Sequence, residues 1–353
     1  MKPLVNVYRG DQIESSHYGS VVVADCDGRV VAFAGDPSAK TFLRSAAKPF
    51  QAIPLLEEGG IEEYDLTGEE IALICGSHGA EPFHVSTAAA LLRKGDFDES
   101  DLLCGPHEPF DPKAARELRS LGELPSALHN NCSGKHAGFL LASRLLDVSE
   151  DDYIDPKHPL QVRLRQVIGA FFDEDPEQLA TAIDGCSIPT FFTSLHRTAV
   201  AYARLAAIAD GEEIHLGRFV DPSRRIIESM TTHPEYVGGW WSVTTPLIEA
   251  YRGSLVAKDG AEAFFAMGLL EPLRVQVCDV LGLRTNRPLG IALKVFDGDS
   301  ERARPFAIAR TLEALGVPIP ETKDIRRFLP ETTTNFAGRN VGSIRSDFRL
   351  EVL

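Results

Sequence analysis

The chain has 353 residues and a mass of 38.5 kDa, with 44% hydrophobic and 25% charged residues, which is the composition of a globular protein with a large core. Its formal net charge of -15 gives no basic patch to neutralise phosphates, which argues against binding to nucleic acid or to anionic membranes. A small substrate is therefore expected. No apolar run reaches the ~18 residues that a membrane span needs. Near the N-terminus the charged residues Arg9, Asp11 and Glu14 stand where a signal peptide would have its apolar core. We therefore predict a cytoplasmic protein.

Two β-branched runs near the N-terminus predict an antiparallel hairpin. They are Ser20 to Ala24 and Val30 to Ala34. The segment between them, Asp25-Cys-Asp-Gly-Arg29, is rich in turn residues.

The stretch from Leu43 to Gln51 predicts the beginning of a helix. Pro49 is tolerated only near a helix start, where its missing N–H matters least, so the helix should begin close to Ser45. Ser45 and Lys48, three residues apart, would then share one face. The positive end of the helix would stabilise an alkoxide and disfavour a charged Lys48, leaving it able to act as a base. Because a Ser-x-x-Lys pattern also arises by chance, the surrounding chain has to decide.

The next segments are short. Pro54 is expected to kink this helix and Gly59-Gly60 to end it. The apolar run from Ile71 to Cys75 fits a buried strand or a helix equally. It breaks at Gly76-Ser-His-Gly79, where the flanking glycines allow a backbone that turns a side chain toward a ligand.

From Glu81 to about Ala250 the pattern is mainly helical. Asp-Pro pairs recur in it as helix-start or turn signals, and we find no repeat of fixed period and no low-complexity linker. The expected helices are Pro82 to Lys94, a helix opened by Asp111-Pro112 and stopped by Gly122, Ser133 to Leu146, Pro159 to Phe172, Asp175 to Ala182, Pro189 to Ala209 and Asp221 to Met230.

Strand-like patterns return near the C-terminus. They cover Ser254 to Ala257, Glu262 to Met267 and Leu289 to Phe296, before a helix from Arg304 to Leu315. We therefore predict a mixed α/β fold, with an antiparallel sheet built from both chain ends and a large helical insertion. The prediction is a single domain over residues 1–353, with a sheet part at about 1–80 and 251–353 and a helical part at about 81–250.

Two further segments concentrate groups that can do chemistry. His129-Asn-Asn-Cys-Ser-Gly-Lys-His136 brings donors, a thiol and an amine to the mouth of a helix. Asp184-Gly-Cys-Ser-Ile-Pro189 is a tight turn between two expected helices, and Asp184 fits a turn or cap residue as well as a ligand-binding one.

Cys132 is expected to have a lowered pKa, because it lies at a helix N-terminus beside Lys135. It is then either a nucleophile or a metal ligand, whereas the alternative is a small buried hydrophobic residue. Together with His136 four residues later, Cys186 and His129, it would make a tetrahedral zinc site. The spacing matches no standard zinc finger.

Five motifs, taken together, resemble a known family. They are Arg44-Ser-Ala-Ala-Lys48-Pro, Cys75-Gly-Ser-His-Gly-Ala-Glu81, His129-Asn-Asn-Cys-Ser-Gly-Lys-His136, Asp184-Gly-Cys-Ser-Ile-Pro189 and Ala257-Lys-Asp-Gly-Ala-Glu262. In this order they are similar to those of the asparaginase II family, the Rhizobium etli-type L-asparaginases. The resemblance runs from about Ser16 to Phe296, and five co-linear motifs are far more specific than any one of them.

The resemblance implies an L-asparaginase, an amidohydrolase that converts L-asparagine to L-aspartate and ammonia, with a serine β-lactamase-like or penicillin-binding-protein fold. It implies two catalytic pairs, Ser45 with Lys48 and Ser77 with Lys258. Without it, Lys258 would be read as a solvated turn lysine.

The resemblance also implies a zinc ion held by Cys132, Lys135 and Cys186. In this ligand set Lys135 takes the place of His136. We expect this Zn²⁺ to tune the site and not to be strictly required. Asp184 would then bind the α-ammonium of asparagine, and Arg44 or His136 its α-carboxylate. The family further suggests a homodimer.

Two alternatives stay open. A β-lactam or peptide hydrolase of the same fold would share Ser-x-x-Lys and a later Lys-x-Gly, although a cytoplasmic location weakens it. A non-catalytic zinc or amino-acid sensor would keep the pocket without turnover. The intact serine and lysine set argues against the sensor, which needs no paired nucleophile and base.

Overall fold

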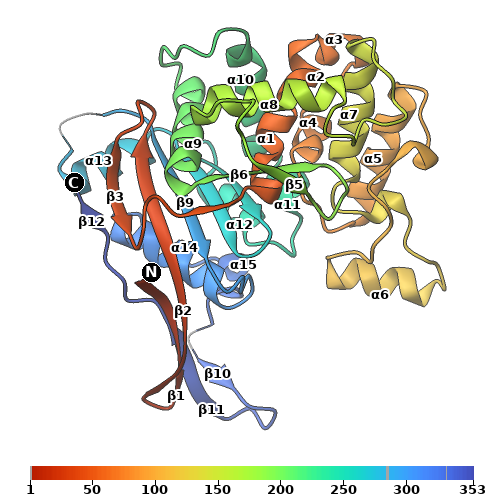
Figure 1. The fold of residues 1–353 in the computed structure, drawn as a ribbon. Helices are drawn as coiled ribbons and strands as arrows, with labels where there is room; N and C mark the ends of the chain where they lie inside the picture. Colours follow the sequence, from red (N-terminus) through yellow and green to blue (C-terminus); the bar gives the residue numbers. More distant parts are fainter. Residues whose placement is uncertain (1, 284–285, 331) are drawn as a thin grey trace. The chain divides into compact units, whose positions relative to one another are not determined.

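The computed structural model describes residues 2–283, 286–330 and 332–353, which form two compact units (Figure 1). The sheet unit consists of Met1–Ala46, Thr193–Gly211 and Ala250–Leu353. The helical unit consists of Ala47–Phe192 and Glu212–Glu249. The helical unit thus begins at Ala47 and not at about residue 81, because the chain turns helical directly after the first strands. A single domain over the whole chain stays a prediction.

The sheet unit contains an antiparallel sheet that is built from both ends of the chain, which confirms the predicted mixed fold class. Neighbouring strands follow the order β10-β11-β1-β2-β9-β8-β7, with β3 paired to β2 and β12 paired to β3. The strands are β1 (Lys2–Arg9), β2 (Gln12–Asp25), β3 (Val30–Ala34), β7 (Leu255–Gly260), β8 (Phe264–Leu269), β9 (Leu289–Val295), β10 (Thr333–Thr334), β11 (Asn340–Arg345) and β12 (Glu351–Val352), and a short β4 (Lys40–Phe42) precedes the helical unit.

The predicted N-terminal hairpin is confirmed. β2 and β3 pair antiparallel, with Val22 opposite Phe33. The turn between them is held by Asp25, whose carboxylate accepts hydrogen bonds from the backbone N–H groups of Asp27 and Arg29. β2 is longer than the expected run, because its first half pairs with β1.

Helix α9 (Leu195–Ala209) lies directly against the sheet because small residues meet there. Gly290 of β9 is paired with Gly268 of β8. A Cβ atom on Gly290 would lie 1.9 Å from the backbone oxygen of Ala199 in α9. The remaining helices of the unit are α13 (Leu273–Leu281), α14 (Ala303–Ala314), which packs on β1, β8 and β9, and the short α15 (Lys323–Arg326).

The helical unit is a set of packed helices around the buried α4 and α7, and most of its predicted helices are confirmed. The apolar run at Ile71 proves to be helical. Its helices are α1 (Lys48–Gln51), α2 (Ile53–Glu57), α3 (Gly60–Tyr64), α4 (Gly68–Ile74), α5 (Pro82–Lys94), α6 (Pro112–Ser120), α7 (Ser133–Leu145), α8 (Pro159–Phe172), α10 (Val220–Thr232), α11 (Pro234–Gly238) and α12 (Thr244–Ala250), with single 3-10 turns at η1 (Arg44–Ala47), η2 (Glu99–Asp101), η3 (Ala127–His129) and η4 (Gly217–Phe219).

Two predicted helices are wrong. The segment from Asp175 to Ala182 forms a turn and then runs into strand β5 (Thr181–Ile183). The segment from Pro189 begins as strand β6 (Pro189–Ser194), which pairs with β5. Its β-branched and aromatic residues favour a strand, and α9 begins only where the Ser194 hydroxyl caps the backbone N–H of Arg197.

The helix expected from Ser45 is divided into short pieces. Arg44–Ala47 is a 3-10 turn that starts at the left-handed φ of +49° of Arg44, and the α-helical backbone begins at Lys48. It ends at Gln51 and restarts at Ile53, because Pro54 cannot continue the hydrogen-bond ladder.

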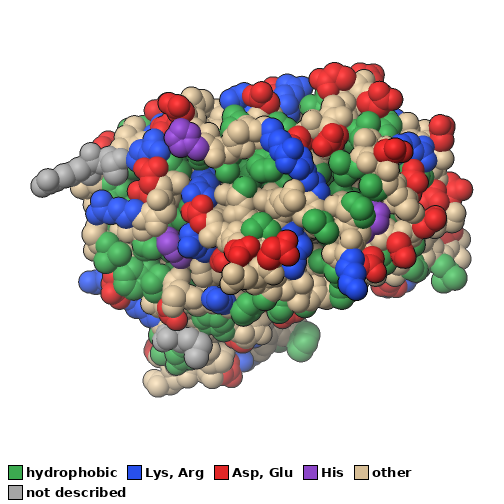
Figure 2. All heavy atoms as spheres, turned by 45° about the horizontal axis from the view of Figure 1, so that its top comes forward, with side chains coloured by type: hydrophobic (Ala, Val, Ile, Leu, Met, Phe, Trp, Pro, Cys, Tyr) green, Lys and Arg blue, Asp and Glu red, His purple; other side chains and the backbone are tan. Residues whose placement is uncertain are grey.

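The surface agrees with the acidic composition. On the face drawn in Figure 2, acidic and basic side chains are interspersed and no continuous basic patch is seen. Among the described residues, none of the helices has the length and apolar character to cross a membrane.

Candidate active site

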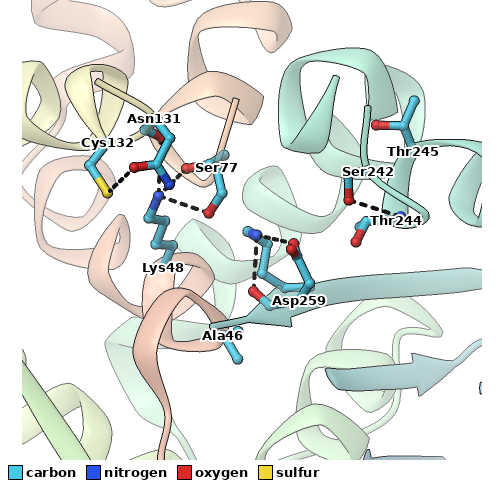
Figure 3. A network of polar contacts seen from close by, with 12 residues as sticks. Ala46, Lys48, Ser77, Asn131, Cys132, Ser242, Thr244, Thr245 and Asp259 are labelled. Carbon is cyan, nitrogen blue, oxygen red and sulfur yellow. Dashed lines mark hydrogen bonds and ion pairs between the residues drawn. The ribbon is translucent and has the colours of Figure 1, made fainter. Parts of the chain in front are cut away.

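Lys48 is the centre of a buried polar site in the helical unit (Figure 3). Its side chain is only 1% exposed at the start of α1. The Nζ atom lies 2.5 Å from the carbonyl oxygen of Gly76, 3.0 Å from Ser77 Oγ and 3.3 Å from the carbonyl oxygen of Asn131. Because lysines are almost never fully buried without partners, this amine is held at one place beside the Ser77 hydroxyl.

The loop that carries Ser77 is fixed by its neighbours. The backbone N–H of Ser77 donates to the carbonyl of Val237. His78 Nδ1 accepts from the backbone N–H of Ala80, so Nε2 carries the proton and donates to Ser133 Oγ at 2.9 Å. Burial, followed by the charges of nearby histidines and of Lys48, holds the pKa of His78 well below its usual value. His78 is therefore neutral, and both of its ring nitrogens make hydrogen bonds that fix the loop.

Asn131 is a site residue that the sequence analysis did not single out. Its carbonyl oxygen accepts from both Lys48 Nζ and the backbone N–H of His78. His107 Nε2 accepts from the backbone N–H of Asn131 at 2.9 Å. The available signal was the position of Asn131 inside the motif around Cys132, whereas His107 gave none.

Lys258 lies in the sheet unit, near the end of β7, and its side chain is fully buried. Its Nζ atom is 2.5 Å from Asp259 Oδ1 and 3.1 Å from the carbonyl oxygen of Asp259. The reading of Lys258 as a solvated turn residue, which the sequence alone favours, is therefore wrong.

The two predicted serine and lysine pairs extend over both units. Ser45, which is half-buried, and Lys258 belong to the sheet unit, whereas Lys48 and Ser77 belong to the helical unit. Lys48 and Ser77, both in the helical unit, are in contact, with Lys48 Nζ 3.0 Å from Ser77 Oγ. The pairs Ser45 with Lys48 and Ser77 with Lys258 stay predictions.

Cys132, Lys135 and Cys186 come together in the helical unit, as the family resemblance implies. All three are buried, and Lys135 Nζ lies 3.0 Å from Cys186 Sγ. A hydrogen bond from Cys186, followed by the charges of Lys135 and Lys48, holds the pKa of the Cys132 thiol well below its usual value. The predicted lowering of this pKa thus agrees in direction. The same hydrogen bond and burial raise the pKa of Cys186.

This donor set fits a soft divalent metal. Thiolates and an amine nitrogen are ligands that zinc accepts, and a low thiol pKa favours the thiolate that binds it. Binding would release the remaining thiol and ammonium protons. Counting only His, Cys, Asp and Glu side chains among the described residues, no group of three or more is arranged to hold a metal ion. The alternative set with His136 and His129 is therefore not assembled, and a zinc site depends on Lys135 as a ligand.

Three residues were predicted to bind the substrate. His136 is fully buried, its Nδ1 lies 2.8 Å from Tyr153 Oη, and burial holds its pKa well below the usual value. Asp184 is half-buried and accepts from the backbone N–H of Gly185 in its own turn. Arg44 is half-buried in the sheet unit. Their roles toward a substrate stay predictions.

A buried lysine amine beside a serine hydroxyl, as in the contact of Lys48 with Ser77, is an arrangement in which a lysine can exchange a proton with a serine. The L-asparaginase II family model matches residues 5–346. The chain therefore belongs to the L-asparaginase II family. Membership supports an amidohydrolase of the asparaginase and glutaminase type, and the sheet built from both chain ends has the order of elements that the sequence predicts.

Other comparisons give distant similarity. No curated protein sequence matches the chain. The chain is similar to a solved structure of Mglu in its tris and glutamate form, with 14% identity and a TM-score of 0.44, covering 91% of this chain and 64% of Mglu. A Bacillus glutaminase structure gives 12% identity and a TM-score of 0.40, covering 86% of this chain and 92% of that chain. The chain thus spans less than two thirds of the Mglu chain in its tris and glutamate form.

Proposed function

We propose that this protein is an L-asparaginase that hydrolyses the side-chain amide of L-asparagine to L-aspartate and ammonia through a serine acyl-enzyme. The observation that carries the proposal is the buried contact of Lys48 Nζ with Ser77 Oγ, inside a chain of the L-asparaginase II family. A cytoplasmic location and a homodimer stay predictions.

In the first half of the reaction, Ser45 Oγ attacks the amide carbon while Lys48 takes its proton. The tetrahedral oxyanion needs backbone N–H donors, among them that of Ser45 itself. When the C–N bond breaks, the proton held by Lys48 passes through Ser77 to the leaving nitrogen, which departs as ammonia. The 3.0 Å contact between Lys48 and Ser77 supports this relay.

In the second half, water attacks the aspartyl ester while Lys48 accepts a proton from the water. Lys48 then returns this proton to Ser45 Oγ as the ester C–O bond breaks, which releases aspartate and restores the enzyme. We assign Lys258 to the same proton transfer, as the partner of Ser77. Its complete burial and its contact with Asp259 support an amine held in a fixed position for this role.

Zinc, where bound, would be held by Cys132, Lys135 and Cys186, and it would supply positive charge and rigidity to this part of the site. Because serine already supplies the nucleophile, a metal-activated water is not needed. Asn131 links the two places, since its side-chain oxygen accepts from Cys132 Sγ at 3.6 Å and its carbonyl oxygen accepts from Lys48 Nζ, which supports a zinc site close enough to tune the site.

The experiment that tests the function measures ammonia release from asparagine and glutamine beside the opening of a chromogenic β-lactam. We expect asparagine turnover that is abolished by Ser45→Ala and strongly reduced by Ser77→Ala, because one removes the nucleophile and the other the relay. Mass spectrometry of the quenched enzyme should find the aspartyl ester on Ser45. An ester on Ser77 would exchange the two roles, and β-lactam opening without ammonia release would reject the proposed substrate.

Removal of zinc is expected to raise KM for asparagine while kcat is largely retained, because the metal positions substrate-binding groups and does not act on the reacting bond. Chelator-treated and zinc-reconstituted enzyme would be compared, with the zinc content of each measured directly. Cys186→Ser should lose the metal, whereas Cys278→Ser, which changes a buried cysteine of the sheet unit, should keep it. Abolished turnover at saturating asparagine, with the fold intact, would show that the metal is directly catalytic.

A further inference from the structure

In the sheet unit, Lys258 belongs to a buried group of three charged side chains with Asp259 and Arg304. One carboxylate oxygen of Asp259 lies 2.5 Å from Lys258 Nζ, and the other lies 3.7 Å from Nη1 of Arg304 in the first turn of α14. All three side chains are at most 8% exposed. A buried carboxylate therefore bridges two buried cations, one oxygen to each.

The turn that follows Lys258 is also held in an unusual conformation. Glu262 and Ala263 have left-handed φ values of +59° and +54°, which residues other than glycine rarely adopt. Such conformations persist only where the surroundings impose them. The backbone here is fastened by contacts from outside the turn: Arg304 Nη1 donates to the carbonyl of Gly260 at 3.2 Å, and Lys294 Nζ donates to the carbonyl of Glu262.

Neighbouring residues of a strand normally point to opposite faces of the sheet. Lys258 and Asp259 are adjacent residues of the paired strand β7, so the ion pair forms because the long Lys258 side chain bends back along the strand, where its Nζ also donates to the Asp259 carbonyl. Arg304 contacts both the carboxylate of Asp259 and the backbone one residue later.

We propose that Arg304, acting through Asp259, is a positioning residue that sets the place of the Lys258 amine for the reaction. The inference rests on the catalytic role of Lys258 in the proposed function. Without the guanidinium, the Asp259 carboxylate loses the cation beside its second oxygen, and the carbonyl of Gly260 loses the Arg304 donor. The amine of Lys258 then moves, while the substrate-binding groups do not change.

The expected result for Arg304→Ala is a fall in kcat of about 100-fold with little change in KM, because a shift of about 1 Å in a catalytic group has this effect. Guanidinium ions added at millimolar concentration should restore part of kcat, and Arg304→Lys should keep more activity than Arg304→Ala. In the Lys258→Met background, Arg304→Ala should cause no further loss. If Arg304 had a purely structural role, guanidinium would not restore kcat, and Arg304→Ala would lower activity further in the Lys258→Met background.

The matched control is Arg274→Ala. Arg274 is another buried arginine of the sheet unit, 3.0 Å from Asp210, with a side chain only 5% exposed. Arg274→Ala should destabilise the fold about as much as Arg304→Ala, but without the fall in kcat and without rescue by guanidinium. If Arg304→Ala behaves like Arg274→Ala while Lys258→Met is inactive, the positioning role is wrong and the proposed function stands. If Lys258→Met keeps full activity, the catalytic role of Lys258 fails and the inference fails with it.

Discussion

Replacement of Lys48 by methionine is expected to lower kcat for asparagine by about 10³-fold or more, the range that the loss of a positioned general base gives. Methionine fills a similar volume but cannot accept the serine proton or pass it to the leaving group. It also leaves the carbonyls of Gly76 and Asn131 without the amine donor, so some loss of stability will accompany the loss of activity.

Lys94→Met is the control for that experiment. Lys94, also in the helical unit, donates to the carbonyl of Asp65 and to the carboxylate of Glu70, at 2.7 Å each, but its side chain is 26% exposed. Steady-state kinetics and thermal unfolding of both variants separate the effects. Comparable stability losses with turnover missing only in Lys48→Met support the base. A Lys48→Met enzyme that turns over asparagine at the wild-type rate removes Lys48 from the mechanism.

The parts of the fold that the sequence predicts well are those with local signals. The hairpin of β2 and β3 has β-branched runs around a turn, and α5 and α8 begin with proline. The error at Pro189 has a physical cause, since the strand-forming residues of β6 run directly into helix α9. The pairing of β6 with β5 and the Ser194 cap set the boundary between them. Strand order depends on contacts between distant segments, which no local pattern encodes.

The site could be predicted as a list of residues more readily than as a set of contacts. Lys48, Ser77 and Cys132 stand in motifs that the family shares, and the chain places them close to one another in the helical unit. The contact of Lys48 with Ser77 joins residues 29 positions apart, so spacing alone favoured Ser45 as the neighbour of Lys48. Arg304 is 45 residues beyond Asp259 and carries no motif, which is why only the packing of α14 shows it.

Substitution of Gly290 by alanine is expected to be the most damaging single change to the stability of the sheet unit. The new Cβ would lie 1.9 Å from the backbone oxygen of Ala199 and 2.4 Å from the backbone nitrogen of Ala203. Neither atom can move without shifting α9 away from the sheet. We expect a loss of about 3 kcal/mol or more in the free energy of unfolding, at the upper end of what overpacking usually causes.

A second-site variant distinguishes this backbone clash from ordinary crowding of side chains. Ala199→Gly removes a methyl group but leaves the backbone oxygen in place, so it should not rescue Gly290→Ala, and the extra helix glycine should destabilise further. Denaturant unfolding of the two single variants and the double variant provides the measurement. Recovery of stability in the double variant, or a Gly290→Ala protein as stable as the wild type, would mean that α9 does not lie directly on the backbone of β9.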